Sequence, residues 1–341
     1  MKKKFVLTLA LVLMVAATLV AAPVEVSGEF KAGYKFTFTD PIGIDNKKLD
    51  GNYADAAEIT VSGDFWSVTF DKLAFSGDSD NAATAKIMLD KALAEQGVDM
   101  GDLTITLGVG SKGNLKPADV YKDSNDAVAE LEMDATGNSF DVTVGYGSLA
   151  TIYMGADPTD TTNKPIVVGV TTTPVDGIKA GFGYTNYAIV TKNSAGTTTS
   201  TSAGITGSVC VDVAALAGLD FGLSLSAIDV FFFEDSVTAK AVNRLYTEVT
   251  ASYEDVAAWV EYQIVDKVNN LKTSVSYSGI ENVGLSASVK LTDLTETVVN
   301  GLETTIGAGA NYTMGGVKYA LDAEYVVDGD FTLTPSVYIA F

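Results

Sequence analysis

The feature that most constrains the fold of this chain is an alternation of apolar and polar side chains with a period of two. In residues 28–40, GEFKAGYKFTFTD, the apolar members are Phe30, Ala32, Tyr34, Phe36 and Phe38. A period of two is typical of a β-strand with one apolar face and one polar face. The pattern of this one strand leaves open whether the apolar face contacts a protein core or lipid.

The same alternation recurs from this segment to the last residues of the chain. We count about eighteen such segments, most of them about 9–11 residues long, which is the length of a tilted strand that spans a bilayer. They begin near residues 26, 55, 65, 103, 127, 139, 149, 165, 178, 203, 217, 243, 256, 271, 281, 302, 316 and 330. The segments at 55 and 65 form either a tight hairpin through SGDF or one bulged strand, so we expect roughly sixteen to eighteen strands.

Charge is confined to one side of these segments. The apolar side carries aliphatic, aromatic and small residues, with Thr151 and Tyr153 among them, and the aromatic ones are expected at membrane interfaces. The charged residues on the polar side are Glu29, Lys31, Lys35, Glu130, Glu132, Asp134, Asp141, Lys179, Asp212, Asp220, Glu248, Glu261, Lys272, Lys290, Glu303, Lys318, Asp322 and Glu324.

These observations together favour a barrel in a membrane. A soluble β-sandwich also alternates, but its strands mix edge, buried and face-switching positions. Near-uniform two-faced strands without a helical layer fit a closed transmembrane barrel better. After the N-terminus no second long apolar run follows, which argues against a helical membrane protein. We therefore predict an all-β fold, an antiparallel up-and-down transmembrane barrel that residues 23–341 form as a single domain with one short helix in a loop.

The N-terminus has the pattern of an export signal. MKKK is followed by the apolar run FVLTLALVLMVAATLV, and Val20 to Ala22 supply small residues of a cleavage site. A transmembrane anchor is the alternative, but the run is short and no basic stop-transfer cluster follows it. Residues 1–22 are thus predicted to be a signal peptide. Because Pro23 is an awkward neighbour for a peptidase, the cleavage site is fixed only to within about two residues.

The composition disfavours several function classes. The chain has no histidine and a single cysteine, Cys210, which removes His-based triads, thiolate metal sites and internal disulfides. The formal charge of −21 and a single arginine, Arg244, are the reverse of a nucleic-acid-binding surface. We expect no metal, no cofactor, no nucleic-acid partner and no enzymatic activity.

The connections alternate between short turns and longer polar loops, as in outer-membrane barrels. Residues 111–126, SKGNLKPADVYKDSND, break this rule because the loop is long yet falls on the short-turn side. Either a strand before this loop is miscounted, or the segment folds into the lumen.

Residues 82–97, AATAKIMLDKALAEQG, have the spacing of a helix. The count places this helix in a loop on the long side. It either constricts the pore, with Lys86, Asp90, Lys91 and Glu95 as its charged residues, or it packs over the barrel mouth.

The last segment, FTLTPSVYIAF, carries the most specific signal. Leu333, Val337 and Ile339 share a face with Phe341, and Tyr338 lies on the other face. This segment resembles the C-terminal strand of bacterial outer-membrane barrel proteins, and with the signal peptide it makes the chain similar to porin-like proteins as a class. The resemblance implies a bacterial outer-membrane location, contact with membrane lipid, recognition of Tyr338 and Phe341 by the barrel-assembly machinery, and the trimeric assembly that porins often have.

The function we predict is passive diffusion of small hydrophilic solutes, with a preference for cations. Fixed negative charge in a narrow pore raises the local concentration of cations. The lumen acids expected to set this preference are Glu130, Glu132, Asp134, Asp141, Asp212, Asp220, Glu248, Glu261, Glu303, Asp322 and Glu324. The alternative is a barrel-anchored adhesin or structural protein, which the Thr- and Ser-rich loop at 191–204 and the apolar run Phe231 to Phe233 favour.

Overall fold

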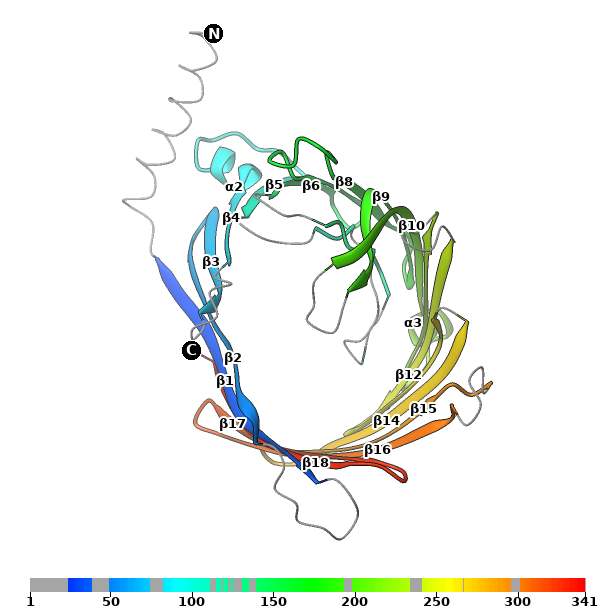
Figure 1. Cartoon of the computed structure of the whole chain (residues 1–341). Helices are drawn as coiled ribbons and strands as arrows, with labels where there is room; N and C mark the ends of the chain where they lie inside the picture. The colour runs from blue at the N-terminus through cyan, green and yellow to red at the C-terminus, as the bar shows by residue number, and fades with distance from the viewer. Residues whose placement is uncertain are drawn as a thin grey trace.

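The computed structural model describes residues 24–38, 49–73, 82–110, 115–117, 119–121, 124, 131–134, 139–192, 198–233, 241–265, 267–295 and 301–340. They form one antiparallel sheet of eighteen strands that closes on itself into a barrel, seen along its axis in Figure 1. The predicted transmembrane barrel architecture is confirmed, with the strand number at the upper end of the expected range. The predicted signal peptide, residues 1–22, lies outside the described residues.

The strands follow one another around the barrel in chain order. They are β1 (Glu25–Phe38), β2 (Leu49–Gly63), β3 (Trp66–Leu73), β4 (Ala82–Met88), β5 (Leu103–Gly110), β6 (Ser139–Tyr146), β7 (Ala150–Ala156), β8 (Ile166–Val175), β9 (Ile178–Lys192), β10 (Thr198–Asp212), β11 (Gly222–Phe232), β12 (Val242–Tyr253), β13 (Val256–Val265), β14 (Val268–Ile280), β15 (Val283–Thr292), β16 (Glu303–Met314), β17 (Val317–Val326) and β18 (Phe331–Ala340).

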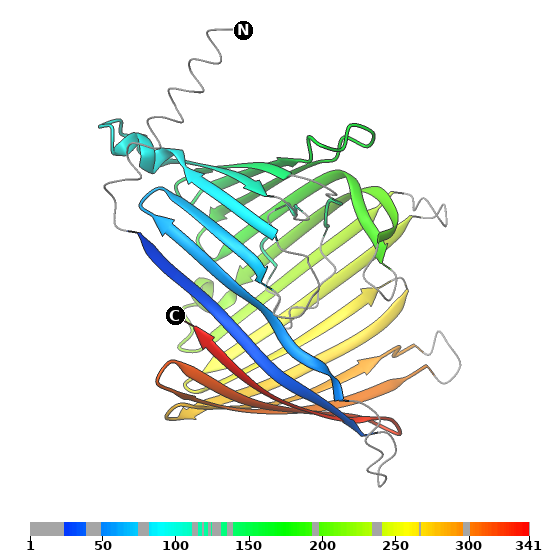
Figure 2. The ribbon, with the colours of Figure 1, turned by 60° about the vertical axis from the view of Figure 1, so that its left-hand side comes forward.

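The barrel closes where β1 pairs with β18. The register runs from Glu29 opposite Ala340 to Phe38 opposite Phe331, and the rings of this last pair lie 5.8 Å apart. Figure 2 shows β1 in blue and β18 in red side by side along this seam. Closure leaves no open sheet edge, so the ladder satisfies the strand amides and carbonyls even where the barrel is surrounded by lipid.

The outer surface is apolar around the barrel. From β6 to β17 one parity of each strand exposes large apolar side chains: Phe140, Ile152, Val168, Phe182, Val209, Leu225, Val249, Val260, Val275, Leu285, Ile306 and Leu321. A surface of this kind is stable next to acyl chains and not next to water. Asp229 near the end of β11 departs from the expected uncharged face, and its carboxylate accepts a hydrogen bond of 2.7 Å from Asn243.

The predicted helix over residues 82–97 is wrong in its first half. Residues Ala82–Met88 form β4, which pairs with β3 and β5, and only Leu89–Ala94 form a helix, α2. Alanine-rich sequence favours a helix weakly, and two neighbouring strands that need partners outweigh that preference. A second short helix, α3 (Val213–Ala217), forms the short connection between β10 and β11.

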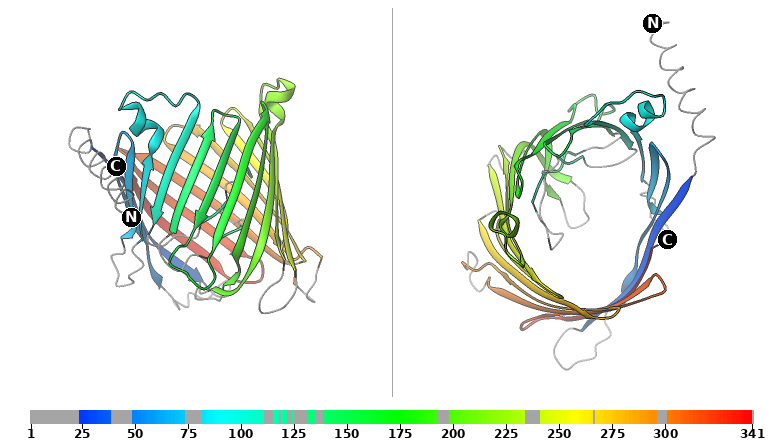
Figure 3. Two further views of the ribbon diagram at one scale, coloured as in Figure 1. Left: turned by 90° about the horizontal axis from the view of Figure 1, so that it is seen from above. Right: turned by 180° about the vertical axis from the view of Figure 1, so that it is seen from behind.

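The missed strand explains the loop that broke the length rule. Counting β4 moves the residues after Gly110 to the long-loop side and moves α2 to the end of the barrel that also carries α3, as Figure 3 shows. The segment predicted at residue 127 is not a wall strand, because β5 pairs directly with β6. One missed strand and one false strand thus cancel in the count.

Among the described residues, no helix is both long enough and apolar enough to cross a membrane.

Candidate functional site: the lumen and its inserted segment

The connection between β5 and β6 runs inside the barrel. The described residues between Leu115 and Asp134, here called the inserted segment, lie within the ring of strands (Figure 1). Met133 donates its backbone N–H to the carbonyl of Leu115 at 2.9 Å and forms a β-bridge with Ala188 of β9. Ile189 donates its backbone N–H to the carbonyl of Glu132 at 2.8 Å, so the segment is joined to the wall by backbone hydrogen bonds.

Glycines of the wall make room for the inserted segment. A Cβ at Gly183 would lie 2.5 Å from the ring of Pro117, and one at Gly155 would lie 2.5 Å from Leu115. Real Cβ atoms essentially never approach so closely, so a side chain at Gly183 displaces Pro117, and one at Gly155 forces at least the Leu115 side chain to move. The wall strands β7 and β9 are therefore matched in shape to this inserted chain.

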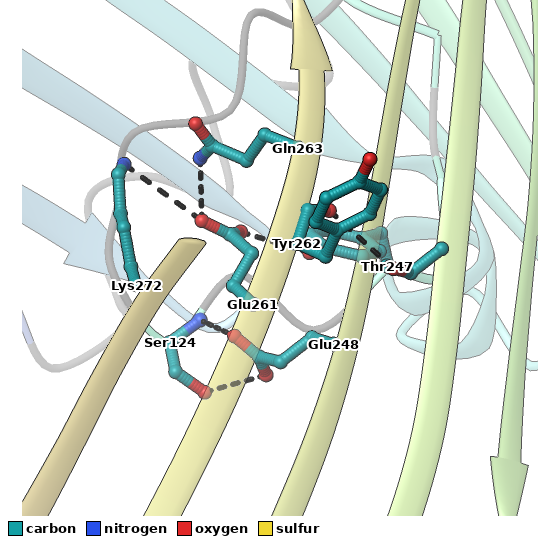
Figure 4. A network of polar contacts seen from close by, with 8 residues as sticks. Ser124, Thr247, Glu248, Glu261, Tyr262, Gln263 and Lys272 are labelled. Carbon is teal, nitrogen blue, oxygen red and sulfur yellow. Dashed lines mark hydrogen bonds and ion pairs between the residues drawn. The ribbon is translucent and has the colours of Figure 1, made fainter. Parts of the chain in front are cut away.

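Two buried carboxylates of the wall hold the segment by hydrogen bonds (Figure 4). Glu248 of β12 accepts from the backbone N–H of Ser124 at 3.1 Å and from its hydroxyl at 2.7 Å. Glu261 of β13 accepts from the Tyr121 hydroxyl at 2.8 Å and lies 3.7 Å from the ammonium group of Lys272. The two glutamates are 2% and 0% exposed, which is stable only because their oxygens are paired.

An apolar cluster lies in the lumen beside these carboxylates. On β11 the alternation changes, and the inward positions after Ser226 carry Ile228, Val230 and Phe232, each at most 1% exposed. They pack with Leu131 of the inserted segment and with Ala188, Val190 and Tyr246 of the wall. The Arg244 guanidinium lies 5.2 Å from the centre of the Phe232 ring and donates to the carbonyl of Val190 at 2.8 Å. Burial of this cluster stabilises the segment in place.

The lumen consequently has a filled half and an open half. Along β9 to β13 many inward residues are buried on the side of the inserted segment, as Thr206, Ser226 and Gln263 show, whereas Trp259 of β13 is only partly buried. Along β15 the inward residues Ser286 and Ser288 are exposed, and Ala287 between them is exposed on the outer face. On its inner side, β15 therefore borders a part of the lumen that no other segment of the described residues covers.

A cavity of about 600 Å³ lies where the two halves meet, between β3 to β7 and the inserted segment. Its lining includes Lys86, Met88, Leu115, Asp141, Thr143 and Tyr153. The placement of Tyr153 and Thr151 on the outer face is wrong: Thr143 and Tyr153 are paired inward positions, while Ile152 and Met154 are exposed outside. Both parities of β7 carry apolar residues, so alternation alone did not fix its phase.

The predicted lumen acids fall into several environments. Asp322 and Glu324 of β17 and Glu303 at the start of β16 have exposed side chains of inward parity, and Asp141 lines the cavity. Glu132 and Asp134 belong to the inserted segment rather than to a wall strand.

Two of the predicted acids lie at the end of the barrel. Asp212 caps α3 by accepting from the backbone N–H of Ala215 at 3.0 Å, and Asp220 precedes the start of β11. Glu130 lies outside the described residues.

The other predicted site residues are separated from one another. Lys86 points into the 600 Å³ cavity from β4, whereas Asp90, Lys91 and Glu95 lie on or next to α2 at the rim, so these four do not form one constriction. The Tyr338 hydroxyl donates to Glu29 at 2.6 Å across the closing seam. Phe341 lies outside the described residues. Tyr121, Ser124 and Trp259 were not among the predicted site residues. Tyr121 and Ser124 show no periodic signal in the sequence, whereas the parity of Trp259 is readable.

The β7–β8 connection at the rim is held by its own hydrogen bonds. Asp157 accepts from the backbone N–H of Thr159 at 2.8 Å, and Asp160 accepts from the backbone N–H and the side-chain amide of Asn163 at 2.9 and 2.8 Å. The hydrogen bonds from Asn163 lower the pKa of Asp160, so this exposed carboxylate stays ionised to lower pH than usual.

The anchoring role of Tyr121 gives a first testable prediction. Tyr121→Phe removes the hydroxyl that donates to the buried Glu261, and a hydrogen bond to a charged group contributes about 1.5–3 kcal/mol. We expect a loss of this size in the free energy of unfolding, measured by urea titration in lipid vesicles, together with more frequent current fluctuations in a single channel.

Tyr262→Phe is the matched control, because Tyr262 also donates a hydroxyl hydrogen bond, to Asn269 at 2.6 Å, but does so on the exposed outer face. Equal stability and equal current noise in the two variants would show that Tyr121 does not anchor the segment.

No protein-family model and no curated protein matches the sequence. Solved structures match over nearly the whole chain. Salmonella typhi OmpF, in a complex with daunomycin, has a TM-score of 0.53 and 10% identity and covers 94% of this chain and 98% of its own. Pseudomonas aeruginosa OpdL has a TM-score of 0.55 and 10% identity and covers 93% of this chain and 98% of its own. At this identity the likeness shows the fold, which is that of the porins. A closed barrel of this fold with an apolar outer face points to the bacterial outer membrane.

Proposed function

We propose that this chain is a porin, a passive channel through which small hydrophilic solutes diffuse across the outer membrane. The observation that carries the proposal is the exposure of inward residues along β15, where the side chains of Ser286, Ser288 and Lys290 are exposed to the lumen. Eighteen strands leave an interior wider than side chains fill, and the described residues of the inserted segment contact the wall on the side of β7 to β13.

The two sequence features that favoured a surface adhesin have another explanation in the barrel. Residues 198–204 of the Thr- and Ser-rich region belong to β10. In the apolar run, Phe232 is buried in the lumen cluster, and the rings of Phe231 and Phe233 pack edge to face at 5.6 Å. These features therefore serve the barrel itself, and no feature of the described residues specifically favours the adhesin.

The preference for cations is part of the proposal. Glu29, Glu303, Asp322 and Glu324 are exposed in the open half, against Lys35, Lys290 and Lys318. Because Glu248 and Glu261 are covered by the inserted segment, the selectivity rests on fewer acids than the sequence suggested. We expect a modest preference, with cations permeating about two to five times faster than anions.

The test is the current through purified protein in planar bilayers. We expect stepwise conductance, and a reversal potential in a KCl gradient that indicates cation preference. Glu324→Gln is expected to shift this potential towards the anion side, whereas Asp229→Asn, which removes an outward carboxylate, is expected to leave it unchanged. Absence of conductance steps from folded protein contradicts the channel, and equal shifts in the two variants contradict the role of the lumen acids.

A homotrimer and recognition of the last strand by the barrel-assembly machinery also belong to the proposal. The bond between Tyr338 and Glu29 joins the last strand to the first at the seam, where assembly of the barrel must finish. Chemical cross-linking of the detergent-solubilised protein distinguishes a trimer from a monomer.

A further inference from the structure

The wall of the open half contains a trough with an aromatic ring at one end and a carboxylate at the other. The cross-strand register links Trp259, Ser274, Ser288, Gly307 and Glu324 on five successive strands from β13 to β17. At a strand spacing of about 4.8 Å, the backbones of Trp259 and Glu324 lie about 19 Å apart. The three residues between them are small, so the floor of the trough is low.

Lysines border one long side of this trough. The next inward row, one pleat along the strands, carries Glu261, Lys272, Lys290 and Thr305. Trp259, Ser288, Lys290 and Glu324 line a cavity of about 260 Å³ together with residues of this row. Lys272 is already engaged by Glu261 at 3.7 Å, and its side chain is only 11% exposed.

Among the charged residues that line this cavity, Lys290 and Glu324 remain as the two exposed charges, and they are of opposite sign. They lie two strands and one row apart, so their backbones are separated by about 12 Å. A lysine and a glutamate at this separation both reach into the trough, where each faces a solute rather than the other side chain. The third element is the Trp259 side chain, which lines the cavity and is only partly buried.

We propose that this trough is a binding subsite for zwitterionic solutes that carry an apolar ring, of the amino-acid type. Lys290 binds the carboxylate, Glu324 binds the ammonium group, and Trp259 stacks on the ring. A solute with only a carboxylate is repelled by Glu324 and has no ammonium group to pair with it. A solute with only an ammonium group is repelled by Lys290 and Lys272 and has no carboxylate to pair with Lys290. The subsite rests on the proposed channel function and assigns a solute class to it.

Fluorescence of Trp259 reports on occupancy of the trough. The chain has two tryptophans, and the other, Trp66, has outward parity on β3, opposite Gly63 of β2 and Ile87 of β4. The variant Trp66→Phe leaves Trp259 as the single fluorophore, and Trp259→Phe leaves only the outward ring as a control. Nitrophenyl groups quench tryptophan on contact, so three matched probes serve: 4-nitrophenylalanine, 3-(4-nitrophenyl)propionate and 2-(4-nitrophenyl)ethylamine.

In Trp66→Phe we expect the quenching constant of Trp259 fluorescence to be about threefold higher for the zwitterionic probe than for either singly charged probe. This is the size of effect expected for one water-exposed ion pair. In that background Lys290→Met should lower the quenching constant of the zwitterionic probe to that of the amine probe, and Glu324→Gln should lower it to that of the propionate probe. In Trp259→Phe the three probes should quench equally and weakly.

Equal quenching of Trp259 by the three probes, or a preference that survives both charge variants, overturns the subsite. The bilayer current of Trp66→Phe is measured on the same preparation. A channel that conducts but does not discriminate the probes contradicts only the subsite, whereas a folded barrel without conductance contradicts the proposed function.

Discussion

Replacing residues 111–138 by Asn-Gly is expected to raise the single-channel conductance by about twofold or more, because the described part of the inserted segment lies inside a lumen that eighteen strands would otherwise leave open. The replacement is compatible with the wall, since Gly110 and Ser139 are cross-strand partners and Asn-Gly is the preferred two-residue hairpin turn. The measurement is the current of single channels in planar bilayers, at a stated salt concentration.

The matched control shortens another connection in the same manner. Ala156 and Ile166 are also cross-strand partners, so residues 157–165 are likewise replaceable by Asn-Gly. The residues Thr159 and Thr161 to Lys164 of this connection are exposed, and we expect its loss to change the conductance little. An unchanged conductance after removal of residues 111–138, from protein that still folds, would mean that the segment does not restrict the pore.

Removal of the segment also tests how its two kinds of anchor contribute. Glu248 and Glu261 would become hydrated, and the free energy of unfolding of the barrel would change little on their account, because water replaces the hydroxyl and amide donors. Ile228, Val230 and Phe232 would become exposed to lumen water, and the loss of their burial is the larger cost at about 1.5–3 kcal/mol for each side chain. The barrel itself is held by its backbone ladder and its lipid-facing side chains, so it should still insert.

The sequence predicted the wall of this barrel well because lipid imposes one rule on every strand. Each outward position must be apolar, so alternation reveals both the strand and its orientation, as in β15, where Leu285 and Val289 face outward and Lys290 faces inward. The rule is least informative where both parities are apolar. In β7 it left Tyr153 and Ile152 equally suited to the outer face.

The interior was harder to predict because contacts inside the lumen obey no such rule. Leu131 and Met133 alternate with Glu130, Glu132 and Asp134 as in a wall strand. Leu131 is 1% exposed and Met133 is 0% exposed. Their apolar sides face the inner wall instead of lipid. The local pattern is the same in both cases, and only the pairing of β5 with β6 distinguishes them. The same segment decides which acids are covered, so parity predicted an inward Glu261 and could not predict its burial.

Single arginines on the two faces of β15 give the second large expected effect. Ala287 and Ser286 are adjacent near the middle of the strand, and both are exposed. Ala287 lies on the outer parity with Val275 and Ala308 as partners, whereas Ser286 lies on the inner parity opposite Ser276 and Gly309. An arginine that faces lipid near the bilayer midplane costs about 2–4 kcal/mol, and one that faces the lumen remains hydrated.

Ala287→Arg is therefore expected to lower the free energy of unfolding by about 2–4 kcal/mol in urea titrations of the protein in lipid vesicles. Ser286→Arg should leave the free energy of unfolding within about 0.5 kcal/mol of the parent protein. It should instead reduce the cation preference in a KCl gradient, because it adds positive charge to the open half of the lumen. The reverse result, with Ser286→Arg destabilising and Ala287→Arg changing selectivity, would require the apolar parity to face inward. The channel and its subsite both depend on the opposite orientation, since only a polar parity turned inward gives water and dissolved ions a path through the barrel.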